Sequence, residues 1–129
     1  MIYVDSSVVL AYLFAESRAP SPELLLDEAL VASRLLEYEV WTRVHAHPAG
    51  RSFENEARRL LDGVELFDMT SRILERALIR WPIPVRTLDA LHLATLEYLR
   101  SMGEPVELAS YDNRLLTAAR ALGITVVAL

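Results

Sequence analysis

The stretch IYVDSSVVLAYLF, residues 2–14, decides the fold, because a short apolar run gives way to an apolar helix at a single aspartate. Ile2 to Asp5 is predicted to be a buried strand, and Ser6 to Phe14 is predicted to be the helix that follows it. A carboxylate in such a place is costly to bury unless it is protonated, matched by a cation or bound to a metal. Asp5 is therefore the first candidate functional residue.

The rest of the chain continues the alternation of helices and strands. The predicted elements are a helix over 23–29, a strand over 30–32, a helix from Ser33 through about His47, a helix over 52–62, a strand over 64–67, a helix from Thr70 that Pro82 stops, a helix from Thr87 that ends before Gly103, a strand over 106–109, a helix over 113–122 and a strand over 124–128. This order favours an α/β fold, in which a mainly parallel central sheet is covered on both faces as a three-layer α/β/α domain. No linker divides residues 1–129, so we expect one domain.

The composition narrows the class of protein. Hydrophobic residues make up 53% of the 129 residues, which excludes a disordered chain, and no apolar run reaches the roughly 20 residues of a membrane helix. A cytoplasmic protein without a membrane partner is the expectation. The net charge of −5 argues against a broad electrostatic grip on nucleic acid, although a bound metal would reverse the potential locally. With no cysteine, metal ligands are restricted to His, Asp and Glu.

Three further acids share the awkward setting of Asp5. Asp112 follows the apolar run that begins at Val106, Glu39 shares a helical face with Leu35 and Leu36, and Asp89 is aligned with Leu93 and Leu96. Because ligands bind beyond the carboxyl ends of parallel strands, Asp5 and Asp112 are expected at one edge of the sheet. Such oxygen ligands suit Mg²⁺ or Mn²⁺, although spacing alone does not prove that the four acids meet.

The chemistry that suits such a pocket is phosphodiester hydrolysis, since a divalent ion activates water and stabilises charge on a phosphate. Other enzymes of this fold class lack support. A phosphate-receiver domain or a haloacid-dehalogenase-type phosphatase requires a lysine, and the chain has none. The four glycines are isolated from one another, which excludes the P-loop and the dinucleotide-binding fingerprint.

Four motifs, in register along nearly the whole chain, resemble a known family. They are Val4-Asp5-Ser6-Ser7, Ser33-Arg34-Leu35-Leu36-Glu37-Tyr38-Glu39-Val40, Thr87-Leu88-Asp89-Ala90-Leu91-His92-Leu93-Ala94 and Ser110-Tyr111-Asp112-Asn113-Arg114-Leu115. The chain is similar to the PIN domain, and within it to the VapC group, the toxins of bacterial type II toxin–antitoxin pairs.

The resemblance implies a Mg²⁺- or Mn²⁺-dependent endoribonuclease with an acidic quartet for metal binding and catalysis. By motif register these four acids are Asp5, Glu39, Asp89 and Asp112. Some relatives have an asparagine at the Asp112 position and an acid three residues later. Here that later residue is Leu115, so Asp112 itself supplies the fourth carboxylate. Glu37 is the rival for the second acid, and family register favours Glu39.

The resemblance also implies supporting residues and partners. Ser7 and Ser110 match hydroxyl positions near the metal or the scissile phosphate, where we expect them to support the ligands. The substrate is expected to be a selected tRNA or ribosomal RNA, cut to inhibit translation and growth. The expected protein partners are a cognate antitoxin and a second copy of the chain in a homodimer.

Each acid also has a simpler structural interpretation. Asp5 and Asp112 are suitable helix N-caps, a role that is compatible with metal binding. Asp89 suits the first turn of a helix, and Glu39 lies four residues before Arg43, at ion-pair spacing. For three further residues the expectation is structural: a buried, hydrogen-bonded role for His92, and surface positions for His45 and His47.

A second function class is a PIN-like scaffold that binds protein and has weak or no nuclease activity. The apolar segment from Val8 to Leu26 supports it, because some of its side chains are expected to be exposed as an interface. Trp41 and Trp81 could stack on RNA bases, but aromatic residues in an apolar chain more often belong to the core or to an interface, and we assign them there. Three arginines near the acids are candidates for steering a phosphate, with a solvated surface role equally open: Arg43, Arg86 and Arg114.

Overall fold

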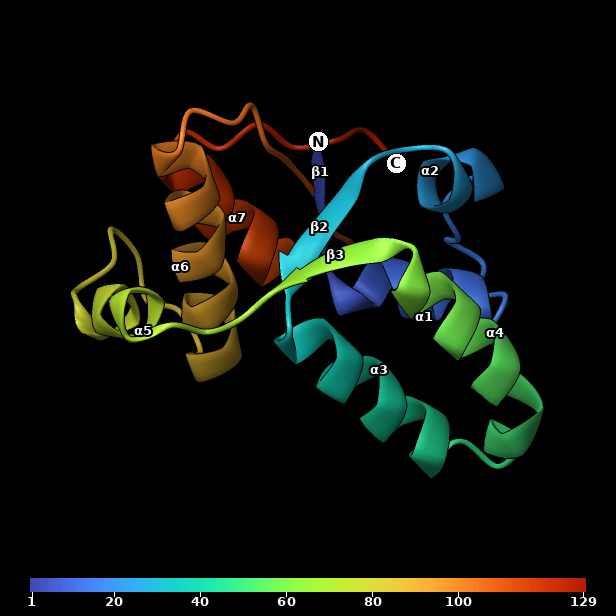
Figure 1. The fold of residues 1–129 in the computed structure, drawn as a ribbon. Helices are drawn as coiled ribbons and strands as arrows, with labels where there is room; N and C mark the ends of the chain where they lie inside the picture. The colour runs from blue at the N-terminus through green and yellow to red at the C-terminus, as the bar shows by residue number, and fades with distance from the viewer.

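The computed structural model describes residues 1–129 and has a four-stranded, all-parallel sheet at its centre (Figure 1). The strands are β1 (Ile2–Val4), β2 (Leu30–Ser33), β3 (Val64–Phe67) and β4 (Glu107–Ala109). They are arranged in the order β3-β2-β1-β4, so β1 pairs with a neighbour on each side. In this register Tyr3 lies beside Val31 of β2 and Leu108 of β4.

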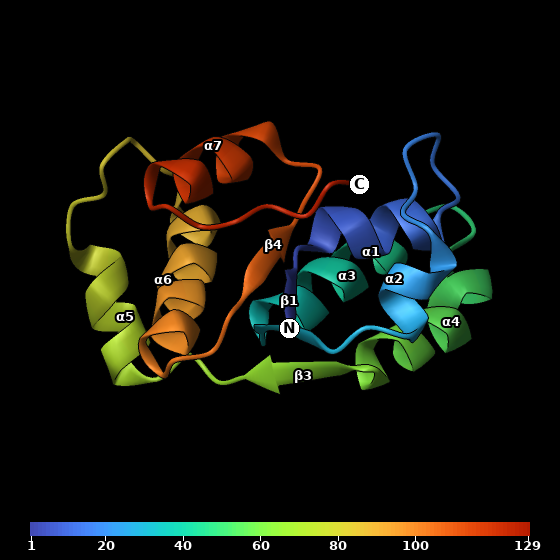
Figure 2. The same cartoon turned by 90° about the horizontal axis from the view of Figure 1, so that it is seen from above.

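Seven helices cover the sheet. They are α1 (Ser6–Leu13), α2 (Pro22–Leu26), α3 (Leu35–Ala46), α4 (Gly50–Asp62), α5 (Ser71–Leu78), α6 (Thr87–Ser101) and α7 (Asn113–Ala121). Figures 1 and 2 both show α1 to α4 gathered on one side of the sheet, with α5, α6 and α7 on the other. The predicted three-layer α/β/α architecture with a parallel sheet is therefore confirmed.

The core is centred on β1 and the helices next to it. The side chains of Tyr3 and Val4 are fully buried, as expected for a strand with helices on both faces. On α3 the buried residues Leu36, Val40 and Val44 recur every four positions, which places one apolar stripe against the sheet. Burying a side chain of this size contributes about 1.5–3 kcal/mol, so these contacts hold α3 firmly against the sheet.

The strand order creates a switch point between β1 and β4. The chain moves outward from β1 through β2 to β3, and then crosses back to place β4 on the opposite side of β1. Beyond the carboxyl ends of two such strands the connections diverge, and the crevice between them is where ligands of open α/β sheets bind. Asp5 lies in this crevice, and its backbone N–H donates to the carbonyl of Ala109 at 3.0 Å.

The predicted strand over 124–128 is wrong. Only an isolated bridge joins Val126 to Leu108, through hydrogen bonds from Leu108 N–H to Thr125 and from Val127 N–H to Leu108, each 2.9 Å long. β4 itself has only three residues, so the last segment finds too short an edge on which to continue a ladder.

Other boundaries differ by a few residues. The predicted helix over 23–29 ends at Leu26, and the helix from Thr70 ends at Leu78, because Ile79 already has an extended backbone. α4 begins at Gly50, two residues before the prediction. None of the helices combines the length and apolar character that crossing a membrane requires.

Candidate functional site

Asp5 is held by hydroxyl groups at the carboxyl end of β1. It is 6% exposed, and its Oδ2 accepts hydrogen bonds from the Ser7 hydroxyl at 2.6 Å, the Ser110 hydroxyl at 3.0 Å and the Ser7 backbone N–H at 3.3 Å. The last contact makes Asp5 the N-cap of α1. All these donors reach the same oxygen, so Oδ1 has no hydrogen-bond partner and is available to a ligand in the crevice.

The two serines are fixed from behind by the backbone. Ser7 Oγ accepts the N–H of Tyr111, and Ser110 Oγ accepts the N–H of Asp112, both at 2.9 Å. Since each hydroxyl has one proton, accepting from the backbone leaves that proton free to point at Asp5. The contacts place Ser7 and Ser110 behind the Asp5 carboxylate, which they orient.

Glu39 projects from α3 to the same crevice, where an imidazole orients it. Its Oε1 accepts a hydrogen bond from His92 Nε2 at 2.6 Å, and its Oε2 accepts one from the Ser6 hydroxyl at 3.3 Å. His92 Nδ1 in turn lies 2.7 Å from the Tyr3 hydroxyl, which accepts the Ser33 backbone N–H at 3.1 Å. A carboxylate only accepts, so Nε2 bears a proton, and in the neutral ring Tyr3 donates to Nδ1.

The hydrogen-bonded series from Ser33 through Tyr3 and His92 to Glu39 is buried, and this environment shifts the pKa values of His92 and Tyr3. Burial lowers the pKa of His92, but the hydrogen bond to Glu39 and the charges of Glu39, Asp5 and Asp89 outweigh it and raise the pKa overall. Burial raises the pKa of Tyr3 far above its ordinary value, so the phenol stays protonated. Tyr3 therefore serves as a permanent hydrogen-bonding group.

The other two acids are joined by an arginine. Arg86 donates from Nε to Asp89 Oδ2 at 3.1 Å and from Nη2 to Asp112 Oδ2 at 2.7 Å. Asp89 lies buried in the first turn of α6, whereas Asp112 is the N-cap of α7 and accepts the N–H groups of Arg114 and Leu115. The bond to Asp89 raises the pKa of Arg86 above its already high ordinary value, so the guanidinium keeps its charge.

Glu39 lies in a different environment from Glu37, the rival for the second acid, and it does not form the ion pair with Arg43 that its simpler interpretation requires. Glu37 forms an ion pair with Arg34 at 3.2 Å on the outside of α3, whereas Glu39 faces the crevice. Glu39 contacts Ser6 and His92 rather than Arg43. His92 is buried and hydrogen-bonded as predicted, and Asp5 and Asp112 do cap helices as their simpler interpretation states.

Two supporting residues, Tyr3 and Ser6, are not predicted from the sequence. A signal existed for Tyr3, since a tyrosine in the middle of a short apolar strand carries a hydroxyl that requires a buried partner. That partner is His92, whose other nitrogen reaches Glu39. Ser6 carried no such signal, because a serine in the first turn of a helix is common.

The donor set fits a hard divalent cation. Asp5, Glu39 and His92 each present a ligand atom within 4.8 Å of the others. His92 Nε2 carries the proton that it donates to Glu39, so the two carboxylates are the atoms of this group that can accept an ion, and Asp5 offers an oxygen that no hydrogen bond occupies. Carboxylate oxygens are the donors that Mg²⁺ and Mn²⁺ prefer. Asp89 and Asp112 lie outside this tight group of ligand atoms and are neutralised in part by Arg86.

Two clefts adjoin the acids. One, of about 480 Å³, is lined by residues that include Arg86, Asp89, Asn113 and Arg114. The other, of about 360 Å³, contains Glu39 and is lined by Ser6, Leu10, Leu35, Tyr38, Glu39, Thr42, Arg43 and Leu88. Each cleft combines a member of the quartet with at least one arginine, so a polyanion has cationic side chains beside the acids.

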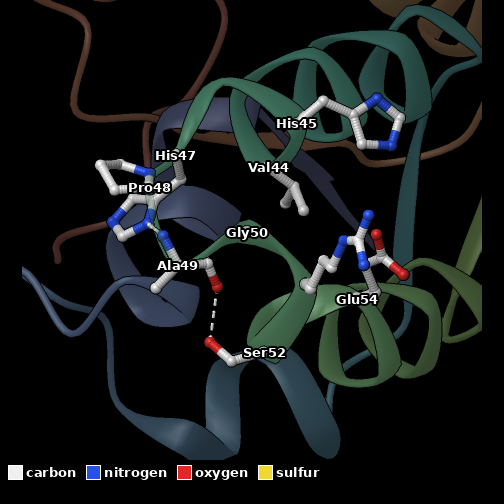
Figure 3. Close-up of a pocket in the computed structure, with 9 residues that line it drawn as sticks. Val44, His45, His47, Pro48, Ala49, Gly50, Ser52 and Glu54 are labelled. Carbon is white, nitrogen blue, oxygen red and sulfur yellow. Dashed lines mark hydrogen bonds between the residues drawn. The ribbon is translucent and has the colours of Figure 1, made fainter.

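A third hollow, of about 530 Å³, lies at the corner between α3 and α4 (Figure 3). Gly50 packs so closely on the Val44 carbonyl that no side chain fits there, and Ser52 Oγ donates to the Ala49 carbonyl at 2.6 Å. His47 is half-buried and stacks on Phe14, which corrects the expectation of a surface position, whereas His45 is exposed as predicted. This hollow contains none of the four acids, and its contacts explain how the corner is built.

The expectation that some apolar side chains of the segment from Val8 to Leu26 are exposed is met only in part. Leu10, Leu13 and Leu25 are buried in the core of the chain itself, whereas Tyr12, Phe14 and Leu24 are half-buried against it. Leu26 is 48% exposed. The most exposed large apolar residues lie elsewhere, with Leu78 86% exposed at the end of α5 and Tyr38 66% exposed beside Glu39.

The two tryptophans pack against the core, in agreement with their predicted role. Each is half-buried, and each has an arginine over its ring, Arg58 at 5.5 Å from Trp41 and Arg76 at 3.6 Å from Trp81. These guanidinium groups cover the ring faces that a nucleic-acid base would need for stacking.

The chain matches known proteins over nearly its whole length. The family model described as the PIN domain matches residues 2–125. Among curated relatives, Ribonuclease VapC46 from Mycobacterium tuberculosis is 36% identical, and the alignment covers 98% of this chain and 96% of that protein.

Solved structures show the same fold at lower identity. A toxin–antitoxin complex from Klebsiella pneumoniae superposes with a TM-score of 0.69 at 19% identity, covering 99% of this chain and 97% of that one. VapC20 from Mycobacterium tuberculosis, described as a toxin that cleaves the sarcin–ricin loop, superposes with a TM-score of 0.65 at 22% identity and covers 92% and 95% of the two chains.

Proposed function

The chain belongs to the PIN domain family and to its VapC ribonucleases, and from this we propose that Asp5, Glu39, Asp89 and Asp112 make up its active site. The observation that carries the proposal is the convergence of hydrogen-bonded acids at the switch point between β1 and β4. The reaction is the metal-dependent hydrolysis of a phosphodiester bond in RNA, with Mg²⁺ or Mn²⁺ as the ion.

The residues of the chain divide the work. Asp5 and Glu39 hold the divalent ion, with Ser7, Ser110 and His92 fixing the direction of their carboxylates. When bound, the ion supplies an activated water and a positive charge beside the scissile phosphate. Asp89 and Asp112 lie at the far side of the crevice, where carboxylates orient the attacking water and the arginines of the two clefts bind the RNA backbone.

The substrate is a structured cellular RNA, and the protein is the toxin of a toxin–antitoxin pair that acts in the cytoplasm. Relatives of this fold include a toxin that cleaves the sarcin–ricin loop and a toxin held in a complex with its antitoxin. A tRNA or a ribosomal RNA is therefore the substrate class, and a cognate antitoxin is the protein partner. Homodimer formation stays a prediction.

Two glutamates on α3 offer a matched test. Glu39→Gln removes an acid that faces the crevice, whereas Glu37→Gln removes one that pairs with Arg34 on the surface two residues away. Total RNA is incubated with each variant and with the unmodified chain, in Mg²⁺, in Mn²⁺ and in EDTA. We expect discrete RNA fragments from the unmodified chain and from Glu37→Gln when Mg²⁺ or Mn²⁺ is present, and none in EDTA. Glu39→Gln is expected to give none under any of these conditions.

Equal cleavage by Glu39→Gln and Glu37→Gln would contradict the assignment of Glu39. Absence of cleavage by the folded, antitoxin-free chain in both ions would instead favour the scaffold function. Tyr38 and Leu88, both exposed on the cleft beside Glu39, then become the surface to examine for a bound protein.

A further inference from the structure

Arg86 is the one arginine that contacts two members of the acidic quartet. Its guanidinium bridges Asp89 Oδ2 at 3.1 Å and Asp112 Oδ2 at 2.7 Å, and these acids begin two different helices, α6 and α7. Arg86 is itself the N-cap residue of α6, three positions before Asp89, so the start of the helix fixes where the side chain begins. The bridge is thus built into the local structure of α6.

The quartet consequently falls into two unlike pairs. Asp5 and Glu39 are held by hydroxyls, a backbone N–H and the His92 imidazole, none of which carries a permanent charge, and their ligand atoms lie close to one another. Asp89 and Asp112 are held by a full positive charge. A guanidinium repels any cation that approaches the carboxylates it holds, and it repels a divalent ion twice as strongly as a monovalent ion at the same distance. A cation at the second pair must therefore displace Arg86 or bind against it.

We propose that Arg86 is a built-in counter-charge for Asp89 and Asp112, so that the site takes a single divalent ion, at Asp5 and Glu39. The inference rests on the proposed nuclease function and refines it. A second metal ion has the task of neutralising charge on the leaving side of a phosphodiester in two-metal sites. In this chain the guanidinium meets that need, since two of its five N–H groups face the carboxylates and three are left for phosphate oxygens.

The position of Arg86 supports this role. Its side chain is 53% exposed and lines the 480 Å³ cleft together with Arg114. An arginine required only to hold two helix starts together has no need of such access. Arg86 is a positioning residue for Asp89 and Asp112, and its free N–H groups lie where RNA passes the acids.

The test counts the metal ions bound, and so does not depend on cleavage. Mn²⁺ binding to the full chain is measured by calorimetry for the unmodified protein and three variants. Arg86→Gln removes the charge and retains an amide, whereas Arg86→Lys retains the charge. Arg114→Ala removes a guanidinium group that lines the same cleft but bonds to no acid of the quartet. Circular dichroism and thermal melting confirm that each variant is folded.

We expect one Mn²⁺ per chain for the unmodified protein, for Arg86→Lys and for Arg114→Ala. Arg86→Gln is expected to bind Mn²⁺ about tenfold more tightly and to take up a second ion, because removing a nearby charge releases two carboxylates. Cleavage of RNA by Arg86→Gln should fall at Mn²⁺ concentrations that fill only the first site, since the phosphate loses its cationic partner, and should recover as the second ion binds. Tighter metal binding together with turnover that recovers as the second site fills is a combination that a merely structural loss does not produce.

Two ions bound by the unmodified chain would overturn the proposal, as would unchanged Mn²⁺ affinity and stoichiometry in Arg86→Gln. The proposed nuclease function fails by a different route. If the unmodified chain cleaves no RNA while Arg86→Gln still gains affinity and a second ion, the counter-charge role stands and the assignment of the reaction falls.

Discussion

The two pairs of acids differ in the chemistry that holds them. Asp5 and Glu39 are oriented by hydroxyls and an imidazole, which fix a carboxylate and leave most of its charge available. Asp89 and Asp112 are oriented by a guanidinium, which cancels part of their charge. The comparison teaches that four acids in one crevice need not be four equal ligands, because their neighbours decide how strongly each attracts a cation.

The largest effect on RNA cleavage is expected when one acid of each pair is substituted in turn and the two losses are compared. Asp5→Asn removes a proposed metal ligand and should lower RNA cleavage about a thousandfold, which corresponds to about 4 kcal/mol of lost transition-state stabilisation. Asp112→Asn should lower it less, since Asp112 is already partly neutralised by Arg86. Asparagine keeps the helix N-cap in both variants, whereas alanine would also cost about 1 kcal/mol of stability at each cap. Initial cleavage rates at saturating Mg²⁺ provide the measurement, and equal losses would erase the division.

Metal addition should stabilise the fold through the first pair. At a Mg²⁺ concentration one hundred times the dissociation constant, binding adds about 2.7 kcal/mol to the free energy of unfolding. In a chain of this size that corresponds to a rise in Tm of roughly 5–15 °C. Asp5→Asn should show almost none of this rise, and Glu37→Gln should show all of it. Thermal melts with Mg²⁺ and with EDTA measure this rise in Tm. A full rise in Tm for Asp5→Asn would show that the ion binds elsewhere.

The hydroxyls behind Asp5 should have a smaller effect. Ser7→Ala and Ser110→Ala each remove a hydrogen bond to a carboxylate, which is worth about 1.5–3 kcal/mol. Part of that loss should appear as weaker Mg²⁺ binding, by about tenfold for each variant. Because both hydroxyls serve the same Oδ2, the double variant should lose less than the sum of the two single variants. Strict additivity in calorimetric titrations would show that the serines act independently.

The smallest effect concerns His92 in the metal-free protein. Its pKa is raised in the folded state, so protonation favours folding. That contribution is fully present below the ordinary pKa of 6.5 and is lost as the pH rises through the higher folded pKa. His92→Gln keeps a donor for Glu39 but does not titrate. Urea unfolding in EDTA from pH 5.5 to 8.5 should therefore show the advantage of the unmodified chain over His92→Gln shrinking as pH rises; a constant difference would contradict the pKa shift.

Much of the fold followed from local patterns. Asp5 at the end of an apolar run marked β1 and the start of α1, and the Ser21-Pro22 pair marked the start of α2. The segment over 124–128 was misjudged because its apolar composition suits a strand, whereas pairing depends on the length of the neighbouring edge, which is a tertiary property.

The site was harder to predict than the fold. Motif register indicated which acids to consider, but neither the bridge from Arg86 nor the chain from Ser33 through Tyr3 and His92 to Glu39 has a local signature. These contacts join residues up to 89 positions apart, so no periodicity within a segment reports them. The grouping of the quartet into unlike pairs depends on such contacts, and for that reason it appeared only in three dimensions.

The hydrogen bond from Ser110 to Asp5 spans 105 positions, and this separation decides when, during synthesis of the chain, the crevice can form. Asp5 and Ser7 leave the ribosome early, yet β4, Ser110 and Asp112 belong to the last fifth of the 129 residues. Until that last portion has emerged and folded, β1 lacks its neighbour β4, and Asp5 lacks one of its two hydroxyl donors. A chain whose synthesis stops before β4 therefore carries an incomplete crevice, and it should lack the nuclease activity proposed for the complete one.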